Sequence, residues 1–239
     1  ILSLVEGKMK REDTKNLVET AYNMILDRIV RFSLSPGVLI SDYSLSKEIG
    51  ISRTPIREAL LKLVDDGLLE KRPHNFKVTD ITKEEIIDLY DARNALEKSM
   101  LELSMEKGIK KKDLASLRIL NESLKKCVED GDIIRSLEYD SKIHRELASL
   151  SENSRLLSFY ERISKQTKRM SIFSLAQEKH EAKDEHEAIF HAIENNDLEG
   201  ALNALSENIL NAQKQHIHVL ENVMKDGWMG IAKFVYRYN

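Results

Sequence analysis

The sequence predicts a mainly α-helical protein in two parts, a small N-terminal domain of helices with a β-hairpin and a C-terminal antiparallel bundle of long helices. Only 9 glycines and 3 prolines interrupt 239 residues, and 32% of the residues are charged, which is typical of helical proteins. Apolar residues recur at helical spacing from residue 14 to residue 32. From Thr82 onward the chain runs in long helical segments with few breaks. We therefore expect residues 1–80 and 81–225 to form the two domains, followed by an aromatic-rich tail at 226–239.

Composition also indicates where the protein works. The single cysteine, Cys127, cannot form an intramolecular disulfide, which fits a reducing compartment. No stretch approaches the ~20 consecutive apolar residues of a membrane span, and the start ILSLVEGKMKRED has only a short apolar run. The sequence therefore predicts neither a signal peptide nor a membrane helix, and it favours the cytoplasm.

The first domain is predicted to contain a helix-turn-helix. After the amphipathic helix at 14–32, the segment SLSPG stops the helix, and a short helix at about 43–49 ends at Gly50. A second helix is expected to begin with Thr54 as its N-cap and Pro55 as its first residue. In this motif the second helix enters the major groove of DNA.

Two arginines at the start of that second helix are the candidate DNA contacts. Ile56, Leu60 and Leu63 form one apolar stripe, so Arg57 faces elsewhere, and Arg53 precedes it by one turn. Net charge is −3, and residues 1–80 carry 13 Lys and Arg against 12 Asp and Glu, so only a local basic face is available for DNA. We expect Arg53 and Arg57 to contact bases or phosphates, and Ser52 and Thr54 to make lesser phosphate contacts.

Two strand-like runs follow Gly67 and predict a wing. LLEKR and FKVTD flank the turn PHN, and two such strands are marginal alone, so they should pack on the helices.

The second domain begins with Thr82 and Glu85, a capping-box pattern. Helices are predicted near 83–106, 111–129, 132–150, 153–177, 181–195 and 197–224, with Asp132 and Asp197 available as N-caps.

The segment LSKEIGISRTPIREALLKLVDDGLL (45–69) closely resembles the winged helix-turn-helix signature of the GntR family of bacterial transcription regulators. The helical remainder resembles the ligand-sensing domain of the FadR (FCD) branch, through ARNALE (92–97), DSKIHREL (140–147) and DEHEAIFHAIENND (184–197). The family usually has glycine at the wing tip, whereas this chain has His74 and Asn75 there. We expect Asn75 to adopt the positive φ of that turn and both residues to lie near DNA.

A metal site is the second expectation. Asp140 and His144 are spaced i, i+4, so their side chains lie on one helix face, close enough to hold one divalent cation. The resemblance implies an Asp and three histidines from three helices; His186 supplies one of these, and Asn208 stands at the position of the last. A neutral amide is a harder ligand than imidazole, so affinity for zinc or nickel should be lower than in the family.

Each of these residues has a simpler interpretation. An Asp–His pair at this spacing is often only a hydrogen bond on a helix surface. The resemblance implies that Arg93 meets an acidic ligand, but a pair with Glu97 explains Arg93 equally well. Arg169 is a weaker candidate for the same role.

Two other functions are alternatives to a metal-dependent sensor. HEAIFH (186–191) superficially resembles the zinc motif of metallohydrolases, but it has one residue too many between its histidines, which places them ~140° apart on a helix. The other alternative is a regulator that binds no metal and senses an acyl or apolar ligand. This alternative stays open because Asn208 occupies the position of the last metal-binding histidine.

The preferred interpretation is a homodimeric, ligand-responsive transcription regulator, most often a repressor in this family, and not an enzyme. Because one short recognition helix reads few base pairs, a two-fold protein on a two-fold operator is expected. The resemblance implies a small carboxylate as the effector. Four aromatic residues of the tail are expected to pack on the bundle or on a partner subunit: Trp228, Phe234, Tyr236 and Tyr238.

Overall fold

The computed structural model describes residues 2–175 and 185–226, and the side chains of 16–174 and 185–222. The four tail aromatics and the predicted helix start at 181 lie outside these ranges. The described chain divides between Ile81 and Thr82 into two compact units, each with its own packing. Within the described ranges, no helix combines the length and the apolar character that a membrane span needs.

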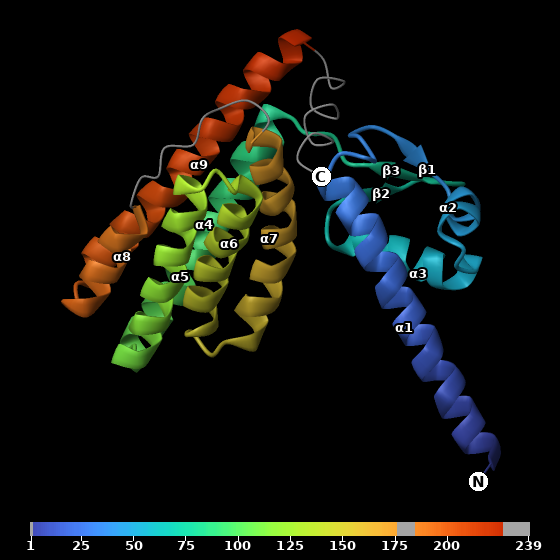
Figure 1. The fold of residues 1–239 in the computed structure, drawn as a ribbon, viewed down its shortest axis with the longest axis horizontal. Coiled ribbons are helices and arrows are strands. Elements are labelled where there is room, and N and C mark those ends of the chain that lie inside the picture. Colours follow the sequence, from blue (N-terminus) through green and yellow to red (C-terminus); the bar gives the residue numbers. More distant parts are fainter. Residues whose placement is uncertain (1, 176–184, 227–239) are drawn as a thin grey trace. The chain divides into compact units, whose positions relative to one another are not determined.

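The first unit is a winged helix-turn-helix, as predicted (Figure 1). Three antiparallel strands form its sheet in the order β1-β3-β2, so β3 is the central strand. Lys77 of β3 lies opposite Leu39 of β1 on one side and opposite Glu70 of β2 on the other. The elements are, in order, α1 (Leu2–Val30), β1 (Leu39–Ile40), α2 (Asp42–Ile49), α3 (Arg53–Asp65), β2 (Leu69–Lys71) and β3 (Phe76–Val78). The third strand, β1, was not predicted from the sequence.

Helices and wing share one hydrophobic core in this unit. Ile25 and Ile29 of α1 are fully buried against Ile56, Leu60 and Leu63 of α3, which confirms the apolar stripe predicted for the recognition helix. Phe76 and Val78 of β3 belong to the same cluster, so the wing packs against the helices, as predicted. At the end of α3, the buried Tyr22 hydroxyl donates a hydrogen bond of 2.6 Å to Asp66 Oδ2.

Two local expectations in this unit were wrong. Helix α3 begins at Arg53, one residue before Thr54, and its N-cap is Ser52, whose side chain makes no capping hydrogen bond. Pro55 still lies in the first turn, where its missing N–H costs nothing. At the wing tip Asn75 does not have positive φ; among described non-glycine residues that conformation occurs at Phe32, Glu152 and Asn196. Lys71 pairs with Phe76, so four residues form the turn, and none of the four has positive φ. Loops of this length are most often built around a type I turn, whose central residues have negative φ.

The second unit is the predicted helical bundle, and its helices fall within a few residues of the predicted bounds. They are α4 (Lys83–Lys107), α5 (Lys111–Glu129), α6 (Ile133–Ser149), α7 (Ser154–Leu175), α8 (Glu185–Glu194) and α9 (Leu198–Asp226). α4 packs against α6, α7 and α9, while α5 packs on α6 and α8 on α9 (Figure 1).

The helix starts of the bundle follow the predicted capping chemistry. Thr82 Oγ1 accepts a hydrogen bond from the Glu85 N–H, and the Glu85 carboxylate accepts one from the Thr82 N–H, both at 3.2 Å. Asp132 accepts from the Arg135 N–H at 3.2 Å, and Asp197 from the Gly200 N–H at 2.9 Å. These caps satisfy N–H groups that have no partner within a helix, so the breaks between helices are specified locally.

Candidate functional site

The interior of the bundle contains charged and polar side chains where apolar ones would pack at lower cost. Isolated buried charges are strongly unfavourable, so such a group needs partners or a function. Apart from serine and threonine, the buried members are Arg93, Glu97, Asn121, His144, Arg169, His186 and His216. Most of them come from α4, α6, α7, α8 and α9, which surround a common interior.

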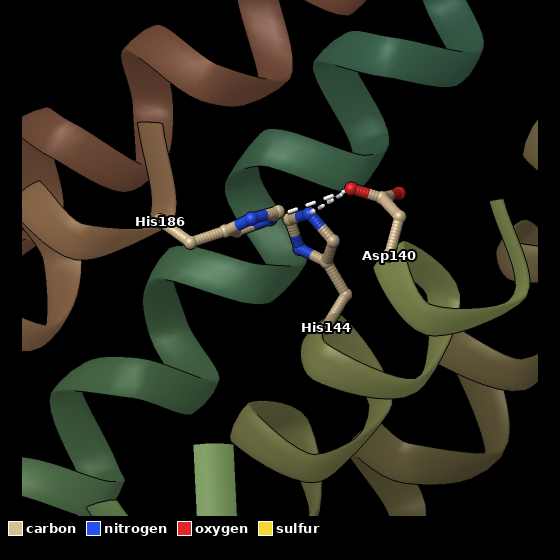
Figure 2. A group of neighbouring side chains, drawn as sticks. All are labelled: Asp140, His144 and His186. Atoms are coloured by element: carbon tan, nitrogen blue, oxygen red, sulfur yellow. Dashed lines mark ion pairs between the residues drawn. The ribbon is translucent and has the colours of Figure 1, made fainter. Parts of the chain in front are cut away.

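Asp140, His144 and His186 converge at one point, as Figure 2 shows. Asp140 and His144 lie one turn apart on α6, and His186 reaches the same point from α8. Nε2 of His186 is 3.4 Å from Asp140 Oδ1, and Nε2 of His144 is 3.9 Å from the same oxygen. One ligand atom from each of the three residues lies within 4.8 Å of the others. The structure therefore brings together three of the four predicted metal ligands.

The orientation of His144 is fixed by Glu97, a residue that the sequence analysis considered only as a partner of Arg93. Nδ1 of His144 lies 2.7 Å from Glu97 Oε2, and both side chains are buried. Because an ionised carboxylate only accepts, this contact places a proton on Nδ1, and Nε2, which faces Asp140, is the nitrogen available to a metal. Histidines that ligate metals are commonly held by a carboxylate in this way.

Glu97 also carries the predicted helical pair with Arg93. Nε of Arg93 donates to Glu97 Oε1 at 2.6 Å, so the two oxygens of one carboxylate serve Arg93 and His144 separately. The pair is not a solvated surface pair, since Arg93 is 7% and Glu97 3% exposed. Burial alone would raise the pKa of Glu97, but the adjacent Arg93 and His144 lower it, and Glu97 stays ionised.

Charge distribution in the site favours the ligating form of Asp140. The Asp140 side chain is 36% exposed. Its partial burial would raise the pKa of this carboxyl, but the contact with His186 and the nearby His144 and Arg93 hold the pKa below the ordinary range. Burial would lower the pKa of Arg93, and the neighbouring Glu97 outweighs that effect and raises it. The site thus holds two carboxylates, a guanidinium and two imidazoles that face one carboxylate oxygen.

The donor set fits a divalent cation. Nε2 of His186 is buried and has no hydrogen-bond partner among the described residues, although it lies 3.4 Å from Asp140 Oδ1. A buried nitrogen without a partner is costly, and a cation placed among the three side chains would satisfy it. Two imidazoles and one carboxylate form a three-ligand set typical of sites that keep an open position for a further ligand.

Asn208, the fourth predicted ligand, has a different contact. Its Nδ2 donates to Glu185 Oε2 at 3.1 Å, and Nδ2 of Asn211 donates to Glu185 Oε1 at 3.0 Å. Two amides of α9 therefore hold the residue that precedes His186. Because an amide nitrogen cannot ligate a cation, only the oxygen of Asn208 could complete a metal shell.

Further polar residues extend the site along α7 and α9. Arg169, which the sequence analysis proposed without knowing its orientation, is 1% exposed and faces the interior of the unit. The ring of Tyr90 lies 5.6 Å from the Arg93 guanidinium carbon and 5.3 Å from the His216 ring. His216 Nδ1 makes a short contact with Ser174 Oγ. Tyr90, Ser174 and His216 were missed because nothing in their spacing distinguishes them from ordinary helix residues.

In the first unit the predicted DNA contacts are accessible to solvent. Ser52, Arg53, Thr54 and Arg57 are all exposed at the start of α3, while Ile56 of the same turn is fully buried. The side chains of Arg53 and Arg57 are 60% and 59% exposed. In the wing turn His74 is exposed and Asn75 partly so. These six residues are accessible to a duplex without rearrangement of the core.

A winged helix-turn-helix with an exposed recognition helix, in one chain with a helical bundle that has a polar interior, is typical of DNA-binding transcription regulators. Residues 17–75 match the family described as "Bacterial regulatory proteins, gntR family", and residues 88–211 match the FCD domain. The chain belongs to the GntR family of bacterial regulators and carries an FCD domain.

Similar proteins agree with this assignment. An uncharacterized HTH-type transcriptional regulator of Bacillus subtilis, YdhC, is 30% identical over 212 residues, which cover 84% of this chain and 91% of the relative. A probable D-xylose utilization operon transcriptional repressor of Paenarthrobacter nicotinovorans is 25% identical and covers 86% and 91%. The solved structure of McbR/YncC of E. coli has a TM-score of 0.70 at 24% identity and covers 86% of this chain and 97% of that one. That likeness supports the fold.

Proposed function

We propose that this protein is a homodimeric transcription repressor that binds a two-fold operator and responds to a small carboxylate held in the bundle through a divalent metal. The observation that carries the effector site is the convergence of Asp140, His144 and His186 on one point inside the helical unit. Repression is supported by the D-xylose relative, which is named as a repressor. We place the protein in the cytoplasm, where an operator would be reached.

The ligand set is consistent with zinc or nickel. Both metals accept imidazole nitrogen and carboxylate oxygen, and Asp140, His144 and His186 supply both, with Asn208 or water completing the shell. When bound, such a cation offers open positions that can hold the oxygens of a carboxylate. Glu97 keeps the Nε2 lone pair of His144 directed to the site, and Asp140 is ionised there.

The charge balance favours an anionic effector. Arg93 and Arg169 supply two positive charges in the bundle, which Glu97 and Asp140 offset. A divalent cation would leave an excess of positive charge in this poorly solvated region, and a small carboxylate would reduce it. Arg93 and Arg169 are the candidate clamps for that carboxylate, since a guanidinium can bind it through two parallel hydrogen bonds.

We assign DNA recognition to the six accessible residues at the start of α3 and in the wing turn. Arg53 and Arg57 would contact base edges or phosphates in the major groove, Ser52 and Thr54 would contact phosphates, and His74 and Asn75 would approach the adjacent minor groove. One recognition helix of 13 residues reads only a few base pairs, so sufficient specificity requires two copies on a two-fold site.

Metal content tests the proposed effector site. Wild type, His144→Ala and His191→Ala are purified identically without chelator, and zinc and nickel are measured by elemental analysis. His191 lies on α8 but is exposed, so its loss controls for the removal of any histidine. We expect metal in wild type and His191→Ala and none in His144→Ala. Equal metal in wild type and His144→Ala would overturn the site, and metal-free wild type would favour a regulator that senses an acyl or apolar ligand.

Thermal unfolding with and without chelator separates metal loss from misfolding. A metal that binds only the folded protein stabilises it by ~2.7 kcal/mol at a hundredfold excess over the dissociation constant. We therefore expect chelator to lower the melting temperature of wild type and His191→Ala. The melting temperature of His144→Ala should not respond to chelator, and its circular dichroism spectrum should show a folded bundle.

A further inference from the structure

The two candidate DNA-contacting arginines are held by one carboxylate, that of Asp42. Asp42 is the first residue of α2, and its Oδ1 accepts from Nη2 and Nε of Arg53 at 2.9 and 3.3 Å. Its Oδ2 accepts from Nη1 of Arg57 at 3.4 Å. Each oxygen therefore engages a different guanidinium, and Arg53 and Arg57 lie one turn apart on the exposed face of α3.

Exposure differs sharply within this group of three side chains. Asp42 is 12% exposed, whereas Arg53 and Arg57 are 60% and 59% exposed. The carboxylate is thus mostly shielded from solvent, while the arginines that it holds remain accessible to an incoming duplex. An exposed ion pair contributes little to stability, so the contribution of this carboxylate to folding is mainly its favourable position in the first turn of α2.

A negative charge beside the recognition helix opposes binding to phosphates. It cancels one of the two arginine charges, and non-specific DNA affinity comes almost entirely from such charges. The same carboxylate fixes the directions of the remaining donors. Arg53 uses its Nε–Nη2 edge, which leaves the Nη1–Nη2 edge directed away from Asp42, and Arg57 uses Nη1, which leaves its Nε–Nη2 edge. A pair of parallel N–H donors is what O6 and N7 of guanine accept.

We propose that Asp42 is a specificity-determining residue, which positions Arg53 and Arg57 for guanine and lowers affinity for DNA that offers only phosphates. This inference rests on the proposed role of Arg53 and Arg57 in operator binding. Asp42 itself is a positioning residue and touches no base.

The test compares full-length wild type, Asp42→Asn, Glu48→Gln and Arg57→Ala. DNA duplexes with a randomised central segment are first selected with wild type, and the enriched sequence and a shuffled version of it serve as the two probes. Affinity for each probe is measured by fluorescence anisotropy at several salt concentrations. Glu48→Gln is the matched control, because Glu48 lies on the same helix and pairs with Arg28 at 2.9 Å rather than with the recognition helix.

We expect Asp42→Asn to lower the ratio of selected to shuffled affinity by ~10-fold or more, within the thousandfold and larger ratios of specific DNA-binding proteins. Its affinity for the shuffled probe should rise, and the slope of log affinity against log salt should steepen by ~0.9, which corresponds to one further phosphate contact. Glu48→Gln should leave the ratio unchanged.

Two results would overturn the inference. One is an unchanged ratio in Asp42→Asn, which would make Asp42 a simple helix-terminal charge. The other is an equal change in Asp42→Asn and Glu48→Gln, which would reflect only the net charge of the surface. Arg57→Ala distinguishes a failure of this inference from a failure of the proposed function. If Arg57→Ala binds the selected probe as wild type does, α3 is not the recognition helix. If it loses binding, only the role of Asp42 is refuted.

Discussion

The hydroxyl of Tyr22 lies 2.6 Å from Oδ2 of Asp66, and this hydrogen bond joins α1 to the residue that caps the end of α3. Both residues are buried, at 6% and 8% exposure. Burial, together with the hydrogen bond and the charge of Asp66, raises the pKa of Tyr22 well above its usual range. The recognition helix is therefore fixed at its C-terminal end by a contact that depends on a neutral phenol.

Tyr22→Phe is expected to lower the free energy of unfolding of the N-terminal unit by ~1 to 3 kcal/mol at neutral pH, because a buried acceptor loses a donor. Chemical denaturation followed by circular dichroism measures the change. Tyr43→Phe is the control, since Tyr43 is 53% exposed and its loss should matter little. Equal effects in the two variants would show that the Tyr22 bond does not stabilise the unit.

The contribution of Tyr22 should depend on pH in a defined direction. Because the folded-state pKa is raised, the stabilisation is fully present below the unfolded value of ~10 and is lost as pH rises through the folded-state pKa. The difference in unfolding free energy between wild type and Tyr22→Phe should thus be constant from neutral pH to ~pH 9 and shrink above ~pH 10. A difference that grows with pH would contradict the assigned shift.

Glu97→Gln should weaken metal binding by ~10- to 100-fold, the usual effect of losing a carboxylate that orients a ligating histidine. It should also destabilise the bundle by ~3 to 5 kcal/mol, since Arg93 would remain buried without its counter-charge. Competition with a chromophoric chelator measures affinity, and thermal unfolding measures stability. Glu102→Gln, an exposed residue of the same helix, is the control and should change neither.

Asn208→His should tighten metal binding by at least ~10-fold, a gain of ~1.4 kcal/mol, because imidazole replaces a neutral amide oxygen. Asn211→His is a close control. Asn211 lies one turn away on α9 and makes the same kind of hydrogen bond to Glu185, so its replacement removes an equivalent contact. If both variants change affinity equally, position 208 does not face the cation.

Arg57→Ala should reduce affinity for the selected duplex by ~1 to 3 kcal/mol and leave the fold intact, since the side chain is exposed. Arg31→Ala controls for the loss of one positive charge, because Arg31 pairs with Asp27 on α1. Electrophoretic mobility shifts with both variants make the comparison. Similar losses in the two would indicate general electrostatic attraction in place of recognition by α3.

Most helices of the fold could be predicted from the sequence because their determinants are local. The apolar stripe of α3 and the capping box at Thr82 and Glu85 involve residues a few positions apart. Strand β1 was missed because its two residues carry no alternating pattern, and the strand is defined by the pairing of Leu39 with Lys77 and of Ile40 with Phe76. Asn75 was misassigned because residue type suggested a left-handed turn, whereas the length of the loop removed the need for one.

The candidate metal site was likewise predictable only where its determinants are local in the sequence. The i, i+4 spacing of Asp140 and His144 is visible in the sequence, and His186 entered through the resemblance to the family. The contact of Glu97 with His144 spans 47 positions and that of Asn208 with Glu185 spans 23, so neither leaves a periodic trace. What the sequence could not supply was the set of long-range contacts that fix how each ligand is oriented.

Glu97 divides its two oxygens between Arg93 and His144, so one negative charge supports both the guanidinium and the imidazole. An anion bound to Arg93 would compete for that guanidinium and leave more of the Glu97 charge to His144, which would make the imidazole a stronger electron donor. By thermodynamic reciprocity, the free energy by which such an anion tightens metal binding equals the free energy by which metal tightens anion binding. Binding of the metal or of the anion would then raise the affinity for the other, and the protein would respond to the concentrations of both together.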